Sequence, residues 1–128
     1  MDKQHKEINH SDERGYIQDI LIDRPIEHVT FIFTQKNTVR GNHFHKETVQ
    51  YAFVLEGKIE YHGVSPSHEH KVVILEKGDL IETPALEKHA IKALEDTKMI
   101  VLTRGPRGGQ RYEDDTFRLE KPIVVASS

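Results

Sequence analysis

The chain has 128 residues, of which 36% are hydrophobic and 30% are charged, and its formal net charge is -3 at pH 7. This length predicts one domain with a core of its own. The absence of cysteine excludes disulfides and thiolate sites, and no apolar run approaches the roughly 20 residues of a membrane span. Without a long basic block, we expect no nucleic-acid partner. The polar first 14 residues lack the apolar centre of a signal peptide, so a cytoplasmic location is the default.

Short apolar runs separated by turn residues predict strands along most of the chain, and no long segment keeps an apolar period of 3.6 residues. The expected strands are 17–22, 27–34, 48–55, 58–62, 71–75, 80–83, 89–94 and 98–103. Short strands at this regular spacing are typical of an all-β sandwich or barrel. The tail from 105 to 128 begins as a loop rich in Gly, Arg and Asp, and it offers a docking strand near Phe117, Leu119 and residues 123–125.

The predicted strand 48–55 carries apolar side chains on both faces, with Gln50 on one face and Tyr51 on the other. A strand buried on both sides needs a second covering layer. That layer is either a second copy of the chain, which would make a homodimer, or a terminal segment of the same chain.

Histidine is the unusual part of the composition, because it is the commonest metal ligand and it titrates near neutral pH. The nine histidines are His5, His10, His28, His43, His45, His62, His68, His70 and His89. Most of these histidines need neither bind a metal nor transfer a proton. His5 and His10 fall in an N-terminal stretch that we expect to be frayed, whereas His68 and His70 fall in SPSHEHK, a run typical of a loop.

His43 and His45 are two residues apart, so on a strand both side chains point to the same face. Two imidazoles on one face can share a metal ion, at about 2.0–2.1 Å per Zn–N bond. A lone pair with this spacing is also common on exposed polar strands. A metal site, an acid–base site and a polar strand are therefore all open readings of the pair alone.

The wider spacing resembles the two motifs of the cupin superfamily. The first motif is matched by His43, His45, Gln50 and Gly57, and the second by Gly78, Pro84, Leu86, His89 and Ala93. The resemblance implies an all-β, single-domain cupin barrel (a double-stranded β-helix, or jelly roll) over residues 1–128, with its core at about 15–104. It also implies a divalent metal ion held by His43, His45 and His89.

Three residues depart from the cupin pattern. Gln50 stands where a glutamate ligand is usual, and a neutral amide oxygen is a weaker ligand than a carboxylate. The ion (Zn, Fe, Mn or Ni) would then be held mainly by the histidines, or no metal binds and Gln50 only hydrogen-bonds a histidine. Leu86 and Ala93 replace a glycine and an asparagine, which leaves His89 untouched.

Two shorter stretches, the DERG run at 12–15 and Arg40-Gly41-x-His43, resemble cupins that act on nucleotide-linked keto-sugars. These are 3,5-epimerases and 3,4-ketoisomerases, with a further likeness to the C-terminal cupin of capsular-polysaccharide reductases. The resemblance implies that Arg40 binds a phosphate and that His43 is the general base. The alternative for Arg40 is a surface salt bridge. In the ketoisomerases a pair like His43 and His45 works without metal, which competes with the metal interpretation.

We therefore expect an isomerase or epimerase of a nucleotide-activated keto-sugar in surface-polysaccharide biosynthesis, with proton transfer at His43 and His45. Tyr51 is a further catalytic candidate, while Tyr61 and Tyr112 are candidates for substrate binding, although packing is the commoner role of such residues. The expected partners are a sugar nucleotide and a second copy of the chain. The alternatives are a metal-dependent dioxygenase or free-sugar isomerase, and a non-catalytic sugar-binding cupin.

Overall fold

Every regular element of the computed structural model, which describes residues 1–108 and 110–125, is a β-strand. The strands are β1 (Asp2–His5), β2 (His10–Asp12), β3 (Gly15–Ile17), β4 (His28–Thr34), β5 (Val39–Phe44), β6 (Val49–Glu56), β7 (Lys58–Val64), β8 (His70–Glu76), β9 (Asp79–Thr83), β10 (Lys88–Ala93), β11 (Thr97–Arg104) and β12 (Phe117–Arg118). This confirms the all-β prediction. No helix in the described part of the chain is long and apolar enough to cross a membrane.

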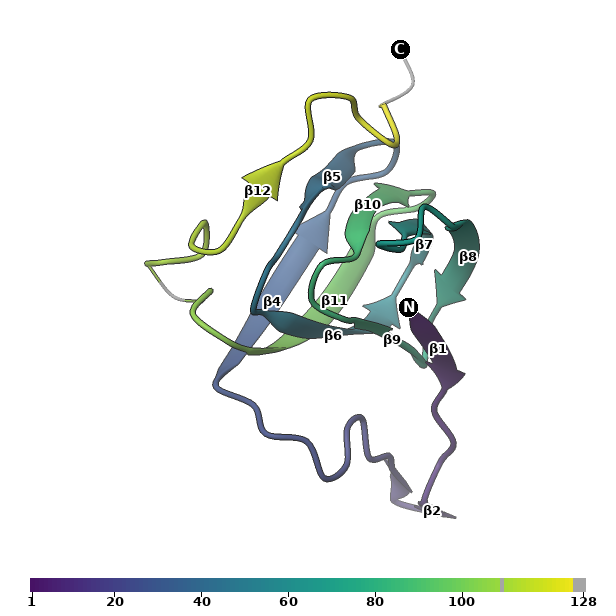
Figure 1. Ribbon diagram of the computed structural model, residues 1–128. Helices are drawn as coiled ribbons and strands as arrows, with labels where there is room; N and C mark the ends of the chain where they lie inside the picture. The colour runs from purple at the N-terminus through teal and green to yellow at the C-terminus, as the bar shows by residue number, and fades with distance from the viewer. Residues whose placement is uncertain (109, 126–128) are drawn as a thin grey trace.

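Two five-stranded antiparallel sheets form the body of the molecule (Figure 1). One has the order β1-β9-β6-β11-β4 and the other the order β12-β5-β10-β7-β8. From β4 to β7 each strand lies in the opposite sheet to the strand before it, which is the arrangement expected of a jelly roll. The predicted jelly-roll barrel is therefore confirmed.

The hydrophobic core lies between the two sheets, because inward-facing residues alternate with outward-facing ones along each strand. Its buried members are Val54, Ile59, Tyr61, Leu75, Ile81, Ala93, Met99 and Val101. Burying a side chain such as Ile59, which is 0% exposed, contributes about 1.5–3 kcal/mol to folding. This core fills one part of the space between the sheets and leaves the other end for polar side chains.

A second, smaller cluster lies on the outer face of the first sheet, where Tyr51, Phe53 and Leu80 are buried. Residues of the segment between β3 and β4, Ile20 and Leu21 among them, pack against this cluster. Here the covering layer is a segment of the same chain. The predicted strand at 17–22 is wrong, because only its first residue belongs to a strand. Its apolar residues instead cover the sheet.

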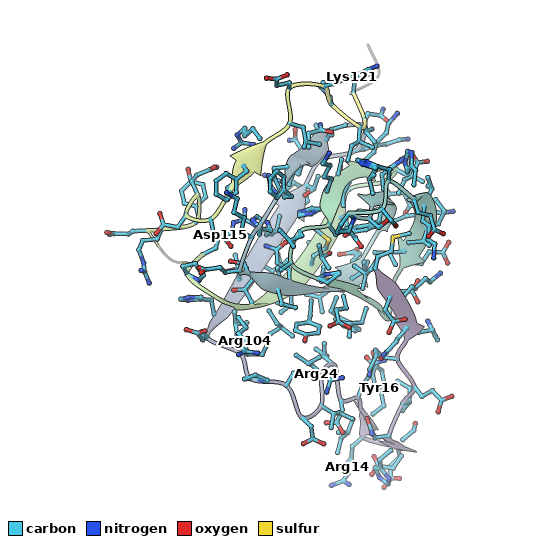
Figure 2. All side chains as sticks on the ribbon, in the orientation of Figure 1. Arg14, Tyr16, Arg24, Arg104, Asp115 and Lys121 are labelled. Carbon is cyan, nitrogen blue, oxygen red and sulfur yellow. The ribbon has the colours of Figure 1, made fainter. Side chains whose placement is uncertain are left out.

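The N-terminal stretch is more ordered than expected. Strand β1 pairs with β9, and the His5 imidazole lies 2.6 Å from the Asp79 carboxylate, so the prediction of a frayed end is wrong there. Beyond β1, the hairpin of β2 and β3 extends away from the barrel (Figure 1). Arg14 in this hairpin pairs with Asp12 at 2.6 Å, and it lies at the opposite end of the molecule from Lys121, well away from Asp115 (Figure 2).

The C-terminal segment returns to the second sheet. Strand β12 pairs with β5, and the ring of Phe117 stacks on that of Phe44 with a centroid distance of 5.3 Å. Further on, the Asn42 amide oxygen accepts hydrogen bonds from the backbone N–H groups of Ile123 and Val124. The loop between β11 and β12 is thus tied down at both ends, close to the open end of the barrel.

Candidate functional site

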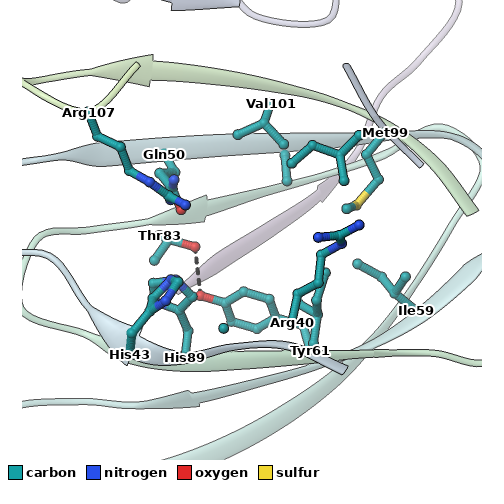
Figure 3. Close-up of a pocket in the computed structure, with 14 residues that line it drawn as sticks. Arg40, His43, Gln50, Ile59, Tyr61, Thr83, His89, Met99, Val101 and Arg107 are labelled. Atoms are coloured by element: carbon teal, nitrogen blue, oxygen red, sulfur yellow. Dashed lines mark hydrogen bonds between the residues drawn. The ribbon is translucent and has the colours of Figure 1, made fainter. Parts of the chain in front are cut away.

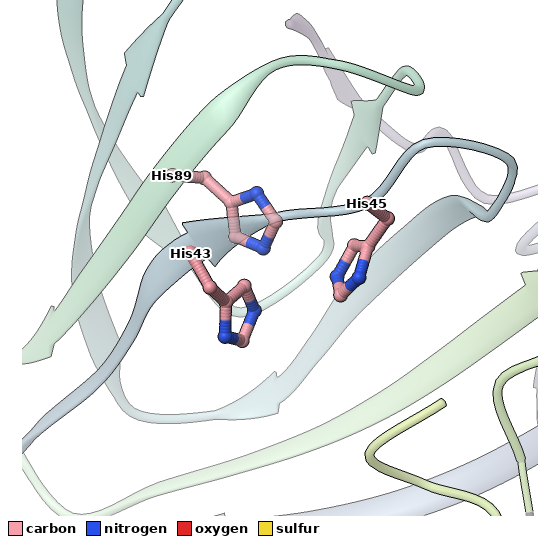
Figure 4. Close-up of side chains that lie close together, drawn as sticks. All are labelled: His43, His45 and His89. Atoms are coloured by element: carbon pink, nitrogen blue, oxygen red, sulfur yellow. The ribbon is translucent and has the colours of Figure 1, made fainter. Parts of the chain in front are cut away.

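Three histidines meet inside the barrel (Figure 4). His43 lies in β5, His45 follows the end of that strand, and His89 lies in β10 directly opposite His43. The three ring centroids are 4.7–5.2 Å apart, and all three residues are buried. One candidate ligand nitrogen from each lies within 4.8 Å of the others. The pairing of β5 with β10 therefore joins the two sequence motifs into one cluster.

Gly41 permits the close approach of these two strands. It has a φ of 97°, and a Cβ at this position would lie 2.8 Å from the carbonyl oxygen of His89. Glycine adopts positive φ freely, whereas this conformation is energetically unfavourable for residues that have a Cβ. Any side chain at Gly41 would also push β10 away and separate His43 from His89.

Backbone carbonyls fix the tautomers of two of the rings. The Nδ1 atom of His45 lies 2.8 Å from the carbonyl oxygen of Asp115, and that of His89 lies 3.1 Å from the carbonyl oxygen of Glu87. A carbonyl can only accept a hydrogen bond, so both Nδ1 atoms carry the proton and both Nε2 atoms have free lone pairs. By contrast, Nδ1 of His43 is buried and has no hydrogen-bond partner among the described residues.

Arg107 brings a positive charge into this cluster from the loop after β11 (Figure 3). Its guanidinium Nη1 lies 3.3 Å from Nε2 of His45, and its Nε donates to the carbonyl oxygen of Tyr112. Because a guanidinium only donates, this contact uses the free lone pair of His45. Arg107 therefore sits on the side of His45 where a metal ion would bind.

The environment keeps all three imidazoles neutral at pH 7. Burial is the main cause that lowers the pKa of His43 to about 2, and the neighbouring His89 adds to the effect. Burial likewise lowers the pKa of His89 to about 4 and lowers the pKa of His45. A neutral imidazole is the form that accepts a proton or ligates a metal.

Inward-facing residues of β6, β7 and β9 complete the site. Gln50 lines the cavity with His43 and acts on His45 as a side-chain hydrogen-bond partner. The Tyr61 hydroxyl lies 2.6 Å from Oγ1 of Thr83 and donates to the buried Glu87 carboxylate at 2.8 Å. Burial raises the pKa of Tyr61 well above its usual range. This hydroxyl is fully engaged within the protein and is a poor proton donor.

Two connected spaces open from the histidine cluster. The inner one is about 100 Å³ and has an apolar floor that includes Ile59 and Met99. The outer one is a cleft of about 720 Å³ between β4, β5 and the loop after β11. Its lining includes Arg40, Arg107 and Tyr112, and also Arg118 and Glu113, whose guanidinium and carboxylate groups pair with each other at 3.0 Å.

Arg40 is held in this cleft by neutral partners. Its Nε donates to Oγ1 of Thr34 at 2.9 Å, and its Nη2 donates to the carbonyl oxygen of Phe33 at 3.0 Å. Within residues 1–108 and 110–125, no carboxylate forms an ion pair with it. The alternative of a surface salt bridge is therefore not what the structure shows, and the charge of Arg40 is available to an anion.

The structure brings most of the candidate residues to one place but leaves one out. His43, His45, His89, Gln50, Arg40, Tyr61 and Tyr112 line the two spaces or form the cluster beside them. Tyr51 does not, because it packs on the opposite face of β6 against Phe53 and Leu80. Sequence reasoning missed Arg107, Arg118 and Asp115, whose only signal was a charged run in the predicted loop.

Comparison with known families agrees with this arrangement. The cupin domain family matches residues 31–103, which include both histidine motifs. The chain belongs to the cupin family. None of the curated proteins matches the chain.

In fold, this cupin is similar to solved structures of sugar-modifying enzymes. A double mutant of the QdtA 3,4-ketoisomerase from Thermoanaerobacterium thermosaccharolyticum, in complex with TDP, has 25% identity and a TM-score of 0.74, covering 92% of this chain and 86% of that one. A 3,4-ketoisomerase from Helicobacter canadensis has 20% identity and a TM-score of 0.75, with 92% and 91% covered. The dTDP-4-dehydrorhamnose 3,5-epimerase from Sulfolobus tokodaii has 19% identity and a TM-score of 0.68, with 84% and 79% covered.

The donor set of this cupin suits a divalent ion, but two features oppose binding. Two rings have their Nδ1–H groups bound to carbonyls, which is the usual way in which proteins orient metal-ligating histidines. The ligand atoms are more widely spread than a bound ion requires, and Arg107 already contacts Nε2 of His45. An ion would bind only if the rings moved closer together and the guanidinium moved away.

Proposed function

We propose that this cupin is an isomerase that moves a proton on a nucleotide-activated keto-sugar, as an epimerase or a ketoisomerase. The observation that carries the proposal is the place of neutral, buried His43 at the inner end of a cleft lined by Arg40 and Arg107, with the Arg118–Glu113 ion pair also in its lining. A base close to two guanidinium groups suits a substrate with a reactive sugar at one end and a diphosphate at the other. The fold similarity to sugar epimerases and ketoisomerases supports it.

In the proposed reaction, a ring nitrogen of His43 accepts the proton from the carbon next to the sugar carbonyl. The C–H bonding electrons form the C=C bond of an enolate, and the carbonyl π electrons move onto oxygen. The Arg107 guanidinium, which adjoins the histidines, stabilises this developing negative charge. For epimerisation, a proton from water adds to the same carbon from the opposite face, and His43 releases its proton to solvent. For ketoisomerisation, the hydroxyl on the carbon that lost its proton gives its own proton to the former carbonyl oxygen, and His43 returns its proton to the former carbonyl carbon, so that the ketone moves by one position.

Binding of the substrate anion also favours the base. The low pKa of His43 results first from burial, then from the neighbouring His89 and His45, and then from the charges of Arg107 and Arg118. A diphosphate bound to these arginines would neutralise part of that charge and raise the affinity of His43 for a proton. The base is therefore strengthened when substrate is present.

We also propose that a divalent ion, when bound, would be held by His43, His45 and His89 with Gln50 as a weak fourth ligand. Such an ion would supply Lewis-acid stabilisation of the enolate oxygen. Because Arg107 contacts His45 in the same region, the guanidinium and the ion compete for one place. This competition supports proton transfer by imidazole as the main function of the site.

Deuterium exchange tests the proposed function. We expect incubation with dTDP- or UDP-linked keto-sugars in deuterated water to incorporate deuterium next to the carbonyl. His43→Asn should lower the rate by a factor of about 10²–10⁴. The matched control is Tyr51→Phe, which alters a residue outside the site and should exchange normally. Absence of exchange over the panel, or an unchanged rate in His43→Asn, would contradict the proposal.

We further propose that the protein works as a homodimer. We also propose that it takes part in surface-polysaccharide synthesis in the cytoplasm. Val29, Phe31 and Phe33 form an exposed apolar stripe along the edge strand β4, with exposed fractions of 67%, 56% and 43%. Large exposed apolar patches usually mark interaction surfaces. A second copy of the chain would cover this β4 stripe.

A further inference from the structure

A second pair of histidines lies outside the barrel, on the outer face of β7 and β8. His62 is opposite Val72 in the register of these strands, and His70 is opposite Val64, so the two histidines are diagonal neighbours on one face. Nδ1 of His62 lies 3.2 Å from Nε2 of His70, with the ring centroids 5.5 Å apart. His70, placed by its sequence in a loop, is instead the first residue of β8.

Glu60 fixes the tautomer of His62. Its Oε1 atom lies 2.7 Å from Nε2 of His62, and a carboxylate accepts hydrogen bonds, so Nε2 carries the ring proton. Nδ1 of His62 is then unprotonated, and its lone pair points at His70. In the metal-free protein, Nε2–H of His70 donates to that lone pair. Moving the His70 proton to its Nδ1 through solvent would leave two lone pairs facing each other.

We propose that His62 and His70 form a second transition-metal site, with Glu60 as the carboxylate that orients His62. Two nitrogens on a tetrahedral zinc ion, at 2.0–2.1 Å each, are about 3.3 Å apart, and the observed separation is 3.2 Å. A carboxylate on the far nitrogen of a ligating histidine is the common supporting contact at such sites. The separation of the two nitrogens therefore already matches that at a bound ion, and a tilt of the exposed His70 ring lets both lone pairs converge on it, whereas the barrel histidines are more widely spread.

The surroundings decide which ions bind. Two imidazoles favour Zn²⁺, Ni²⁺ or Cu²⁺ over Mg²⁺ and Ca²⁺, which prefer oxygen ligands. The side chain of His62 is only 14% exposed and is held by Glu60, so little freedom is lost on binding. His70 is exposed, which gives the ion access from solvent and leaves water to fill its remaining positions.

Titration with zinc chloride tests this site on the intact chain. We expect calorimetry to show one equivalent of Zn²⁺ that His70→Ala removes and that magnesium chloride does not replace. Glu60→Gln should bind this equivalent about 10–100 times more weakly, because the support for His62 is lost. The matched control is His68→Ala, a neighbouring histidine outside the pair, which should bind as the wild type does.

Imidazole NMR is done on the wild-type protein, so its result does not depend on whether a variant folds. Zn²⁺ should shift the ¹⁵N resonances of His62 Nδ1 and His70 Nε2 at the concentrations that saturate the calorimetric site. Unchanged resonances, or an unchanged zinc stoichiometry in His70→Ala, would overturn the proposal. A loss caused by His68→Ala but not by His70→Ala would also overturn it.

Discussion

The Arg107 guanidinium and the His45 imidazole meet at 3.3 Å, although they are 62 residues apart in the chain. The contact places a fixed positive charge beside the cluster of His43, His45 and His89. Burial lowers the pKa of Arg107 from its ordinary value, but an arginine remains charged at any physiological pH. The protein thus carries its own cation at the place where an ion would bind.

Replacing this cation should separate the two proposed functions of the site, proton transfer and metal binding. We expect Arg107→Met to lower kcat/KM for a keto-sugar nucleotide by about 30-fold, the loss of one charged hydrogen bond worth about 2 kcal/mol. Zn²⁺ binding at the barrel histidines should become at least about tenfold tighter, because a repelling charge is removed. Both are measurable in a His70→Ala background, where the surface pair does not contribute.

Arg111→Met is the control for this change, since Arg111 is an exposed arginine in the same loop. It should leave both quantities unchanged. Weaker zinc binding in Arg107→Met would show that the guanidinium supports the metal site instead of competing with it.

Gly41→Ala should lower the free energy of unfolding by about 3 kcal/mol, through strain at positive φ and contact with the backbone of β10. The control is Gly15→Ala, which has a φ of 135° but no atom within 4 Å of the added Cβ. It should cost about 1 kcal/mol. Urea unfolding measures both, and equal losses would show that the approach of β5 to β10 is not under the control of Gly41.

The Asp115 carboxylate accepts hydrogen bonds from the backbone N–H groups of Lys46, Glu47 and Thr48 at 2.8–3.0 Å. Burial alone would raise the pKa of Asp115, but these hydrogen bonds outweigh it, and the pKa is lowered. A lowered folded-state pKa means that the stabilisation is fully present above the unfolded pKa of about 3.9. It is lost as the pH falls through the folded value.

Asp115→Asn should therefore destabilise the protein by about 1 kcal/mol at pH 7. Asparagine tolerates the positive φ of 55° at this position, so the backbone is unaffected. The difference from the wild type should be constant above about pH 5 and should shrink below pH 4. A difference that grows as the pH falls would contradict this account.

Leu86 occupies the place of the glycine in the second cupin motif, and its φ is 73°. Positive φ is costly for leucine, by about 1–2 kcal/mol, and its side chain is half exposed. Leu86→Gly should therefore raise the free energy of unfolding by up to about 1 kcal/mol. Val72→Gly, at an exposed strand position, should lower it by about 1 kcal/mol. A loss at both positions would show that the Leu86 side chain contributes more than its backbone costs.

The β4 stripe of Val29, Phe31 and Phe33 predicts dimer formation that a single charge disrupts. We expect the wild type to elute as a dimer in size-exclusion chromatography with light scattering, and Phe31→Lys to elute as a monomer. Val72→Lys places the same charge on an exposed apolar position of the other sheet and should remain dimeric. A monomeric wild type, or a dimeric Phe31→Lys, would rule this surface out.

The fold and the histidine cluster could be predicted because their signals are local or regularly spaced. Strand alternation predicted an all-β sandwich or barrel, and the resemblance to the two cupin motifs predicted that His43, His45 and His89 form one cluster. The same alternation places Tyr51 on the opposite face of β6 from Gln50, so choosing Tyr51 as a catalytic residue contradicted the pattern from which the strand was predicted.

The remaining part of the site could not be predicted from local pattern. Arg107 and Asp115 reach His45 across 62 and 70 residues, and nothing in a polar loop marks such contacts. The predicted strand at 17–22 failed for a related reason. Ile20 and Leu21 are apolar because they cover a sheet, and a covering segment has the same composition as a short strand.

The dependence of the site on the loop after β11 has a consequence for shortened forms of the chain. Strand β11 ends at Arg104, so a chain cut after this strand keeps all three histidines and loses both Arg107 and Asp115. Nε2 of His45 then has no guanidinium beside it, and its Nδ1–H has no carbonyl acceptor. The histidines come from the strands, and the loop controls how they can be used.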